Sequence, residues 1–251
     1  MTTLADLIPD HISVRDVDGY LDVLPPEEDA QTGPFEGVYG AMYTAVLNRP
    51  ALLRPIARAV WGSSNMMSQF EQTVSNSVSD LGPDSVLLDV PCGGGTTFAV
   101  LEKVGYTGCV VGADLSATML ARAVRRTQST NLHVELLRCD ALNLPLRDCS
   151  VDGVLSINGL HCMPSPRRFL ESLFRVLKPG RTAWMTTLVS GASRRSELAN
   201  AWAQRHGVLP QQPPEHDALL EMAASIGFVV EDLGGAGVVG VALVRPETVV
   251  R

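Results

Sequence analysis

The chain has 251 residues, of which 45% are hydrophobic and 19% are charged. This size suits one large α/β domain, or one domain with a modest appendage, and excludes a multidomain assembly. The net charge of −7 opposes a phosphate backbone, so we expect no nucleic-acid partner. No stretch approaches the ~20 consecutive apolar residues that cross a bilayer, and no targeting leader is readable. We therefore expect a soluble cytoplasmic protein without stable membrane insertion.

The cysteines and histidines do not show the spacing of a metal site. There are five of each, and neither a CxxC pair nor an HExxH motif occurs among them. An odd number of scattered cysteines is typical of buried thiols in a reducing compartment. The sequence therefore predicts neither a disulfide framework nor a bound metal.

The first third of the chain differs in composition from the rest. Residues 1–34 are rich in Asp, Glu and Pro, which predicts a loosely held arm. Apolar residues then recur at three- and four-residue steps, which predicts two short helices over 35–62 and a third over 65–78. We therefore expect an arm and helical cap over residues 1–82, ahead of a main domain over residues 83–251.

In the main domain, short apolar runs alternate with helical patterns, as in βαβ units with a parallel sheet. The glycine-rich link at 234–237 indicates a hairpin, so the last strand is predicted to run antiparallel. The fold class is thus α/β, a Rossmann-like sheet of seven strands with helices on both faces. The predicted strands span 85–90, 109–114, 133–138, 151–157, 182–188, 228–233 and 238–244, and the predicted helices span 96–104, 116–128, 166–177 and 214–226.

The strongest local signal is the segment VLLDVPCGGGTT, residues 86–97. An apolar strand ends at Asp89 and is followed by Gly93, Gly94 and Gly95, which open a helix. Glycines at such a turn let the backbone approach a ligand closely, next to the N–H groups of a helix start. A tight turn without a ligand is the alternative interpretation.

The next three strands each place polar residues at the same edge of the sheet. Asp114 ends the second strand, where a carboxylate can accept both hydroxyls of a ribose; its alternative role is to interact with the following helix start. Asp140 follows the third strand and suits the amine of adenine, although an acid in a polar loop is ordinary. Asn158 follows the fourth. Since ligands bind at the carboxyl ends of parallel strands, these residues should face one crevice.

These motifs, in this order, resemble those of the class I S-adenosylmethionine-dependent methyltransferases, and among them the branch that includes the ubiquinone and menaquinone biosynthesis methyltransferases. The resemblance covers residues 83–190, including the phrase RVLKPGR at 175–181. It implies S-adenosyl-L-methionine as cofactor and S-adenosyl-L-homocysteine as product. The family usually has glycine where Pro91 stands, so a contact through that N–H is lost. The residues that the resemblance places at the cofactor are Asp89, Pro91, Gly93, Gly95, Asp114, Leu115, Met119, Asp140, Ala141 and Asn158.

Three residues are predicted at the substrate. His161 is the only histidine at a predicted strand tip facing the crevice, so it is our candidate for a general base or for a group that orients the substrate. The family often carries histidine here without needing it for chemistry. Tyr39 and Tyr43, four apart on a predicted helix, could present their ring faces to the sulfonium; core packing is the alternative.

The resemblance implies methyl transfer to an O or C atom of a small, partly apolar metabolite. Enzymes that methylate adenine or glutamine nitrogens typically carry Asn/Asp-Pro-Pro-Tyr/Phe where this chain has the sequence NGLH from Asn158 on, which disfavours those substrates. The N-terminal helices and the segment 189–214 are expected to cover the pocket. Two alternatives stay open: a protein that binds S-adenosylmethionine without methyl transfer and, less favoured by the contiguous glycines, an NAD-dependent oxidoreductase. A homo-oligomer, paired through the N-terminal helices, is also left open.

Overall fold

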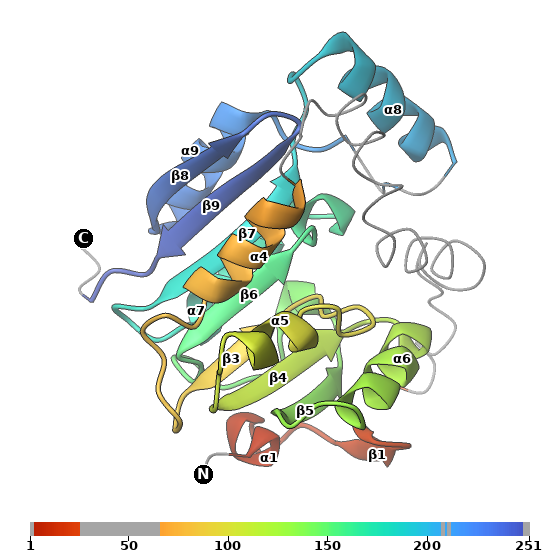
Figure 1. Cartoon of the computed structure of the whole chain (residues 1–251), viewed down its shortest axis with the longest axis vertical. Coiled ribbons are helices and arrows are strands. Elements are labelled where there is room, and N and C mark those ends of the chain that lie inside the picture. Colours follow the sequence, from red (N-terminus) through yellow and green to blue (C-terminus); the bar gives the residue numbers. More distant parts are fainter. Residues whose placement is uncertain (1–2, 26–65, 207–208, 210–211, 248–251) are drawn as a thin grey trace.

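The computed structural model describes residues 3–25, 66–206, 209 and 212–247. Within these residues the chain forms one twisted sheet, with the strand order β1-β2-β5-β4-β3-β6-β7-β9-β8 (Figure 1). Strands β3 to β7 are mutually parallel, whereas β9 runs antiparallel to both β7 and β8, which confirms the predicted hairpin. The strands are β1 (Arg15–Val17), β2 (Tyr20–Asp22), β3 (Val86–Asp89), β4 (Cys109–Asp114), β5 (His133–Arg138), β6 (Gly153–Ile157), β7 (Thr182–Leu188), β8 (Val229–Gly235) and β9 (Val238–Val244).

The sheet has two strands more than the seven predicted, because part of the N-terminal arm joins it. Strands β1 and β2 form a hairpin, and β2 pairs in parallel with β5. The buried carboxylate of Asp22 is paired with the buried guanidinium of Arg138 at 3.2 Å. Leu4 and Leu7, one turn apart, are also buried. The prediction of a loosely held arm is therefore wrong for residues 3–25, since local composition did not reveal these long-range partners.

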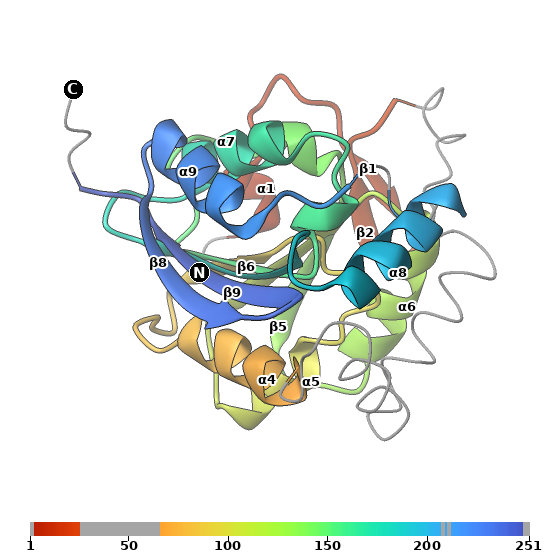
Figure 2. The same ribbon diagram turned by 90° about the horizontal axis from the view of Figure 1, so that it is seen from above.

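Helices cover both faces of the sheet, as predicted (Figure 2). Helices α1, α7 and α9 share one hydrophobic cluster with one face, and α4, α5 and α6 share a second cluster with the other. Helix α8 stands apart from these layers, beside the carboxyl end of β7 (Figure 1). The helices are α1 (Leu4–Leu7), α4 (Met66–Asn76), α5 (Phe98–Lys103), α6 (Ala117–Thr127), α7 (Pro166–Val176), α8 (Arg194–Arg205) and α9 (His216–Ile226).

Two predictions for the first third of the chain are not addressed by this architecture. The helices predicted over residues 35–62, with Tyr39 and Tyr43, lie outside the described residues. The domain boundary near residue 82 likewise stays a prediction. Helix α4 does form where a helix was predicted over 65–78. In the described parts of the chain, no helix combines the length and the apolar character needed to span a bilayer.

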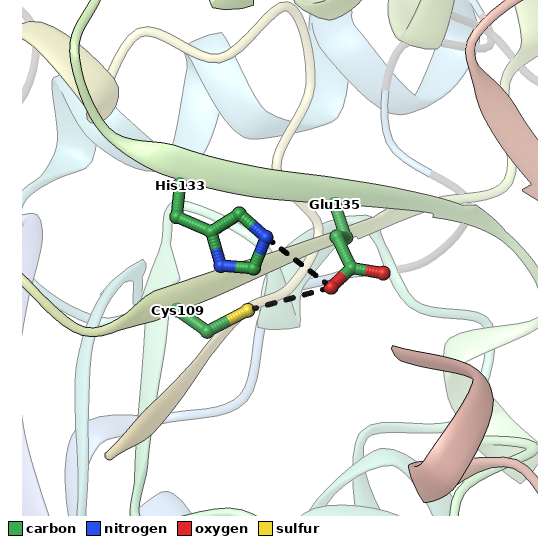
Figure 3. A group of neighbouring side chains, drawn as sticks. All are labelled: Cys109, His133 and Glu135. Atoms are coloured by element: carbon green, nitrogen blue, oxygen red, sulfur yellow. Dashed lines mark hydrogen bonds and ion pairs between the residues drawn. The ribbon is translucent and has the colours of Figure 1, made fainter. Parts of the chain in front are cut away.

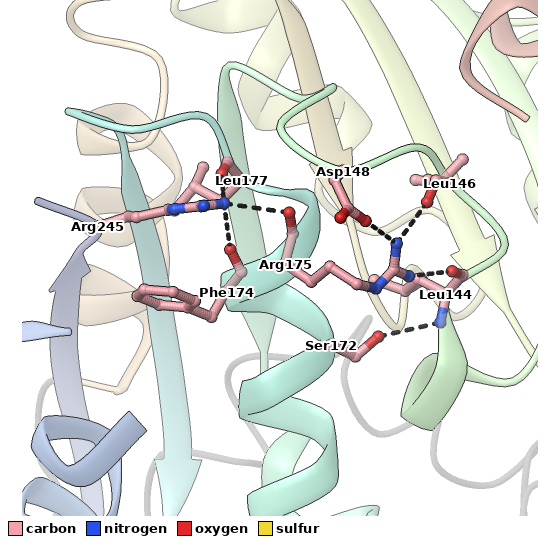
Figure 4. Close-up of polar contacts among 8 residues, drawn as sticks. All are labelled: Leu144, Leu146, Asp148, Ser172, Phe174, Arg175, Leu177 and Arg245. Atoms are coloured by element: carbon pink, nitrogen blue, oxygen red, sulfur yellow. Dashed lines mark hydrogen bonds and ion pairs between the residues drawn. The ribbon is translucent and has the colours of Figure 1, made fainter. Parts of the chain in front are cut away.

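Arg245, just after β9, closes the carboxyl end of α7 (Figure 4). Its Nη1 donates to the backbone carbonyls of Phe174, Arg175 and Leu177 at 2.6, 3.1 and 2.5 Å, and its guanidinium lies 4.7 Å from the centre of the Phe174 ring. Carbonyls in the last turn of a helix lack partners within the helix. One cationic side chain therefore satisfies this end of α7 and fixes it to the end of β9.

We expect Arg245→Leu to lower the free energy of unfolding by about 2–4 kcal/mol, because hydrogen bonds to charged groups contribute about 1.5–3 kcal/mol each and some of the freed carbonyls can turn to water. Urea denaturation measures the change. The control is Arg181→Ala, which breaks a surface ion pair with Asp80 at 3.5 Å and should cost less than about 1 kcal/mol. Equal losses in the two variants would contradict the capping role.

Candidate cofactor site

A cavity of about 750 Å³ lies at the carboxyl ends of β3, β4, β5 and β6. This is the edge where parallel α/β sheets bind their ligands. The structure brings eight of the ten predicted cofactor residues to its wall: Pro91, Gly93, Asp114, Leu115, Met119, Asp140, Ala141 and Asn158. The other two, Asp89 and Gly95, are not among the described lining residues and lie in or behind the glycine turn.

Asp114 joins two of the loops that surround the cavity. Its Oδ2 accepts the backbone N–H of Gly93 at 2.8 Å, and its Oδ1 accepts that of Ser116 at 2.9 Å. Ser116 in turn caps α6, since its hydroxyl accepts the N–H of Met119 at 3.1 Å. A carboxylate offers about four acceptor positions on its two oxygens. Asp114 is therefore held in a fixed orientation at the cavity wall, with its carboxylate at the place where the resemblance puts the ribose.

The glycines of the turn have two different roles. Gly93 has a φ of +53°, and a Cβ added there would meet no atom within 4 Å, so its missing side chain leaves room at the cavity wall. Gly95 has a φ of +74°, and a Cβ there would lie 2.4 Å from Cε2 of Phe98. Gly95 thus lets the turn pack against α5, whereas Gly93 keeps the cavity open to a ligand.

Asp89, the last residue of β3, is fully buried behind this turn. Its Oδ2 accepts the hydroxyl of Thr97 at 2.5 Å, but its Oδ1 has no hydrogen-bond partner among the described residues. Burial raises the pKa of Asp89 to about 7, and the nearby charge of Asp114 adds to the rise. Buried polar atoms are almost always paired. An unpaired carboxylate oxygen next to a lining threonine fits a site that takes a cationic ligand group, such as the ammonium of S-adenosylmethionine.

Pro91 forms part of the wall by packing against Gly159. The Val90–Pro91 peptide bond is cis. A Cβ added at Gly159 would lie 2.3 Å from Cδ of Pro91 and 2.8 Å from the hydroxyl oxygen of Ser156. The proline that departs from the family pattern is thus accommodated because the facing residue on the next loop has no side chain.

We expect Gly159→Ala to weaken cofactor binding at least about tenfold, because the new methyl group would displace Pro91 from the wall by more than an ångström and overpacking typically costs about 1–3 kcal/mol. Calorimetric titration with S-adenosylmethionine measures the change. Gly82→Ala, where a Cβ meets nothing within 4 Å, is the matched control. Unchanged binding in Gly159→Ala would show that this contact does not shape the site.

His161 does not reach the described cavity wall. It lies in a short 3₁₀ turn, Leu160–Cys162, where its Nδ1 accepts the backbone N–H of Leu188 at 3.2 Å and lies 3.1 Å from the hydroxyl of Thr187. An accepting Nδ1 assigns the ring proton to Nε2. Burial lowers the pKa of His161 to about 4. The geometry makes His161 a positioning residue for the end of β7, so its role as a general base stays a prediction that the contacts do not favour.

The apolar part of the cavity is bordered by one of the predicted N-terminal helices. It is formed by Met67 and Phe70 of α4, with Met163, Ile157 and Val238. The expectation that the N-terminal helices cover the pocket is thus met by α4, although the sequence did not indicate which of its side chains reach the cavity. The described residues between Val189 and Pro214, expected to cover the pocket, are absent from the cavity wall.

Comparison with known proteins shows what the region around this site is similar to. Residues 88–185 match the methyltransferase domain family model. A 2-phytyl-1,4-beta-naphthoquinone methyltransferase of Arabidopsis thaliana is 39% identical over 99 residues, which cover 38% of this chain and 38% of that protein. A demethylmenaquinone methyltransferase of Bacillus cereus is 39% identical over 105 residues, 41% of this chain and 44% of that protein. The matched region thus spans less than half the length of these relatives.

A solved structure supports the same fold. The geranyl diphosphate C-methyltransferase of Streptomyces coelicolor, crystallised with S-adenosyl-L-homocysteine, has a TM-score of 0.59 and 18% identity, covering 71% of this chain and 77% of that one. The residues that match the family model, 88–185, run from β3 to β7 and include each loop that lines the polar part of the cavity. Residues 88–185 of the chain therefore match a methyltransferase domain, and this part of the chain is similar to the quinone methyltransferases.

Proposed function

We propose that this protein transfers a methyl group from S-adenosylmethionine to an O or C atom of a small, partly apolar metabolite of the quinone-precursor type. The observation that carries the proposal is one continuous cavity with two chemically different parts. Its polar part contains Asp114, Asp140 and the open side of Gly93, and its apolar part is formed by α4 and the residues after β6. A polar cofactor and an apolar acceptor can therefore lie side by side.

The residues of the chain bind and orient rather than react. When bound, S-adenosylmethionine supplies an electrophilic methyl carbon next to a sulfonium. Asp114 would hold its ribose and Asp140 its adenine, while Met163 and Phe70 exclude water from the acceptor side. Holding the two reactants in line at close range supplies much of the rate enhancement of such a transfer.

The two cysteines of the described cavity wall are not activated nucleophiles. Cys92 and Cys162 both line the cavity, but burial raises the pKa of both thiols, that of Cys162 to about 12, so they are protonated at neutral pH. With His161 directed to β7, the described wall favours acceptors that ionise readily, such as phenols and activated carbon acids, over aliphatic hydroxyls. The similarity to a 2-phytyl-1,4-beta-naphthoquinone methyltransferase and to a demethylmenaquinone methyltransferase supports the same class of acceptor.

Binding and mass measurements test this function. Calorimetry should show binding of S-adenosylmethionine and none of NADH; binding of NADH alone would overturn the assignment in favour of an oxidoreductase. Incubation with S-adenosylmethionine and a reduced demethylnaphthoquinone should then add one methyl group to the quinone, detected by mass spectrometry. Cofactor binding without methylation of any small-molecule extract would indicate a binding protein, and labelling confined to tRNA or protein fractions would overturn the acceptor class.

We also propose that the protein acts in the cytoplasm and that it forms a homo-oligomer. All five cysteines are free, which supports a reducing compartment. The oligomer rests on the sequence expectation for residues outside the described part of the chain. Light scattering during size-exclusion chromatography gives the mass directly, and a value of 26.9 kDa would contradict the oligomer.

A further inference from the structure

Three metal-binding residue types meet at the edge of the sheet opposite the cofactor cavity (Figure 3). Cys109 and His133 begin the neighbouring strands β4 and β5 and are directly paired in register. Glu135 stands two residues after His133, so both side chains project to the same face. Since β4 runs from Cys109 to Asp114, the cluster lies roughly 16 Å from the cofactor site.

The two distances from Glu135 to the other side chains are close to those in a zinc site. Oε1 of Glu135 lies 3.9 Å from Sγ of Cys109 and 3.5 Å from Nε2 of His133, and one donor atom from each residue lies within 4.8 Å of the others. A tetrahedral zinc ion with its usual bonds to sulfur, nitrogen and oxygen holds these atoms about 3.3–3.6 Å apart. The two distances to Glu135 lie within a few tenths of an ångström of these values, and the sulfur and the imidazole nitrogen need to approach each other by no more than about 1.5 Å.

The hydrogen bonding of the cluster is incomplete. Nδ1 of His133 is buried without a partner among the described residues, whereas Nε2 of the same ring lies 3.5 Å from Oε1 of Glu135. The other oxygen of Glu135, Oε2, accepts the backbone N–H of Leu4 at 3.0 Å, which leaves Oε1 directed at Cys109 and His133. The carboxylate is thus already oriented by α1, as a metal-binding carboxylate is oriented by an outer hydrogen bond.

The cluster is also accessible. Cys109 is buried, but the side chains of His133 and Glu135 are 38% and 26% exposed, so one side of the cluster opens to solvent. An ion can enter from this side, and a water molecule can complete a four-coordinate set. Soft thiolate and imidazole donors with a single carboxylate favour zinc over calcium or magnesium, which take oxygen ligands.

We propose that Cys109, His133 and Glu135 form a binding site for one zinc ion. On binding, the thiol of Cys109 releases its proton to solvent and the thiolate sulfur bonds to the ion. The site ties together β4, β5 and, through Leu4, helix α1. This role is structural and does not depend on the proposed methyl transfer. Rules based on spacing along the chain did not predict it, because its ligands come from two adjacent strands.

Cobalt titration of the metal-free full-length chain tests the site, since Co²⁺ bound to a thiolate gives a charge-transfer absorption. We expect one Co²⁺ per chain and its displacement by one Zn²⁺. Cys109→Ser should abolish the absorption, and His133→Gln and Glu135→Gln should each weaken zinc binding at least about tenfold. Cys149→Ser and Cys162→Ser, at other free cysteines, should retain it.

The outcomes of this titration show whether the metal binds at Cys109, His133 and Glu135 or at another place in the chain. All five cysteines and all five histidines lie in the described residues. Absence of the absorption in the unaltered chain, its persistence in Cys109→Ser, or its loss in Cys149→Ser or Cys162→Ser would overturn the proposal. If Cys109→Ser fails to fold by circular dichroism, His133→Gln and Glu135→Gln decide, because their side chains are partly exposed. S-adenosylmethionine binding in these two variants should equal that of the unaltered chain, which separates the metal site from the cofactor site.

Discussion

Asp114→Ala is expected to weaken the binding of S-adenosylmethionine at least about 100-fold. Hydrogen bonds to a charged group contribute about 1.5–3 kcal/mol each, so losing the two proposed ribose contacts would cost about 3 kcal/mol or more. The substitution also removes the acceptor of the Gly93 and Ser116 N–H groups, at 2.8 and 2.9 Å, and so releases both cavity loops. Calorimetric titration of the purified variant measures the dissociation constant.

Two further variants identify the cause of that loss. Asp114→Asn keeps the size and one accepting oxygen, so its affinity should fall between those of Asp114→Ala and the unaltered chain. Asp148→Ala removes a carboxylate that is 71% exposed and paired with Arg175, remote from the cavity wall, and should leave binding unchanged. An Asp114→Ala protein that is folded and still binds with the original affinity would refute the assignment of the polar part of the cavity.

The elements that carry the site could be predicted from the sequence because they are set by local patterns. Strands β4 and β5 begin and end at the predicted residues, since apolar runs are bounded there by turn residues and end in a polar group. The glycine turn and Asp114 followed from the same alternation of strand, loop and helix. Because the polar residues at the strand ends are set by local patterns, the polar part of the cavity could be predicted.

The remaining features depend on contacts between distant residues. The acidic arm enters the sheet through the pair of Asp22 with Arg138, more than a hundred positions away, which no local pattern shows. Helix α8 exposes its large apolar residues, Leu198 and Trp202, so it lacks the core-facing period that predicts a helix. His161 was placed correctly after β6, but the 3₁₀ turn directs its ring to Leu188. The direction of a loop side chain is set by packing rather than by its position in the sequence.

Asp89 and His161 are expected to give this protein two opposing pH dependences of stability that nearly cancel. The pKa of Asp89 is about 7 in the folded protein and 3.8 in the unfolded chain. Between these values the folded state binds more protons, so stability falls as pH rises from about 4 to 7. His161 titrates at about 4 when folded and at 6.5 when unfolded, so here the unfolded state binds more protons and stability rises with pH over about 4 to 6.5.

Each contribution should amount to a few kcal/mol, since one pH unit of pKa difference is worth about 1.4 kcal/mol. Asp89→Asn removes the first contribution, so its stability should rise steadily as pH increases from 4 to 6.5. His161→Asn, whose side-chain oxygen can still accept the Leu188 N–H, removes the second, so its stability should fall from pH 4 to 7. The double variant should be nearly as flat over this range as the unaltered chain.

Urea denaturation of the cofactor-free protein at half-unit pH steps measures these curves. If the free energy of unfolding of the two single variants changes with pH in the same way, neither buried group has the pKa difference between folded and unfolded states given above. If the cofactor's ammonium pairs with the unpaired oxygen of Asp89, adding S-adenosylmethionine should favour the ionised carboxylate and reduce the fall in stability between pH 4 and 7. The same addition should leave the slope of Asp89→Asn unchanged, because the responding carboxylate is absent. If S-adenosylmethionine changes the pH dependence of stability equally in the unaltered chain and in Asp89→Asn, its ammonium lies elsewhere in the cavity.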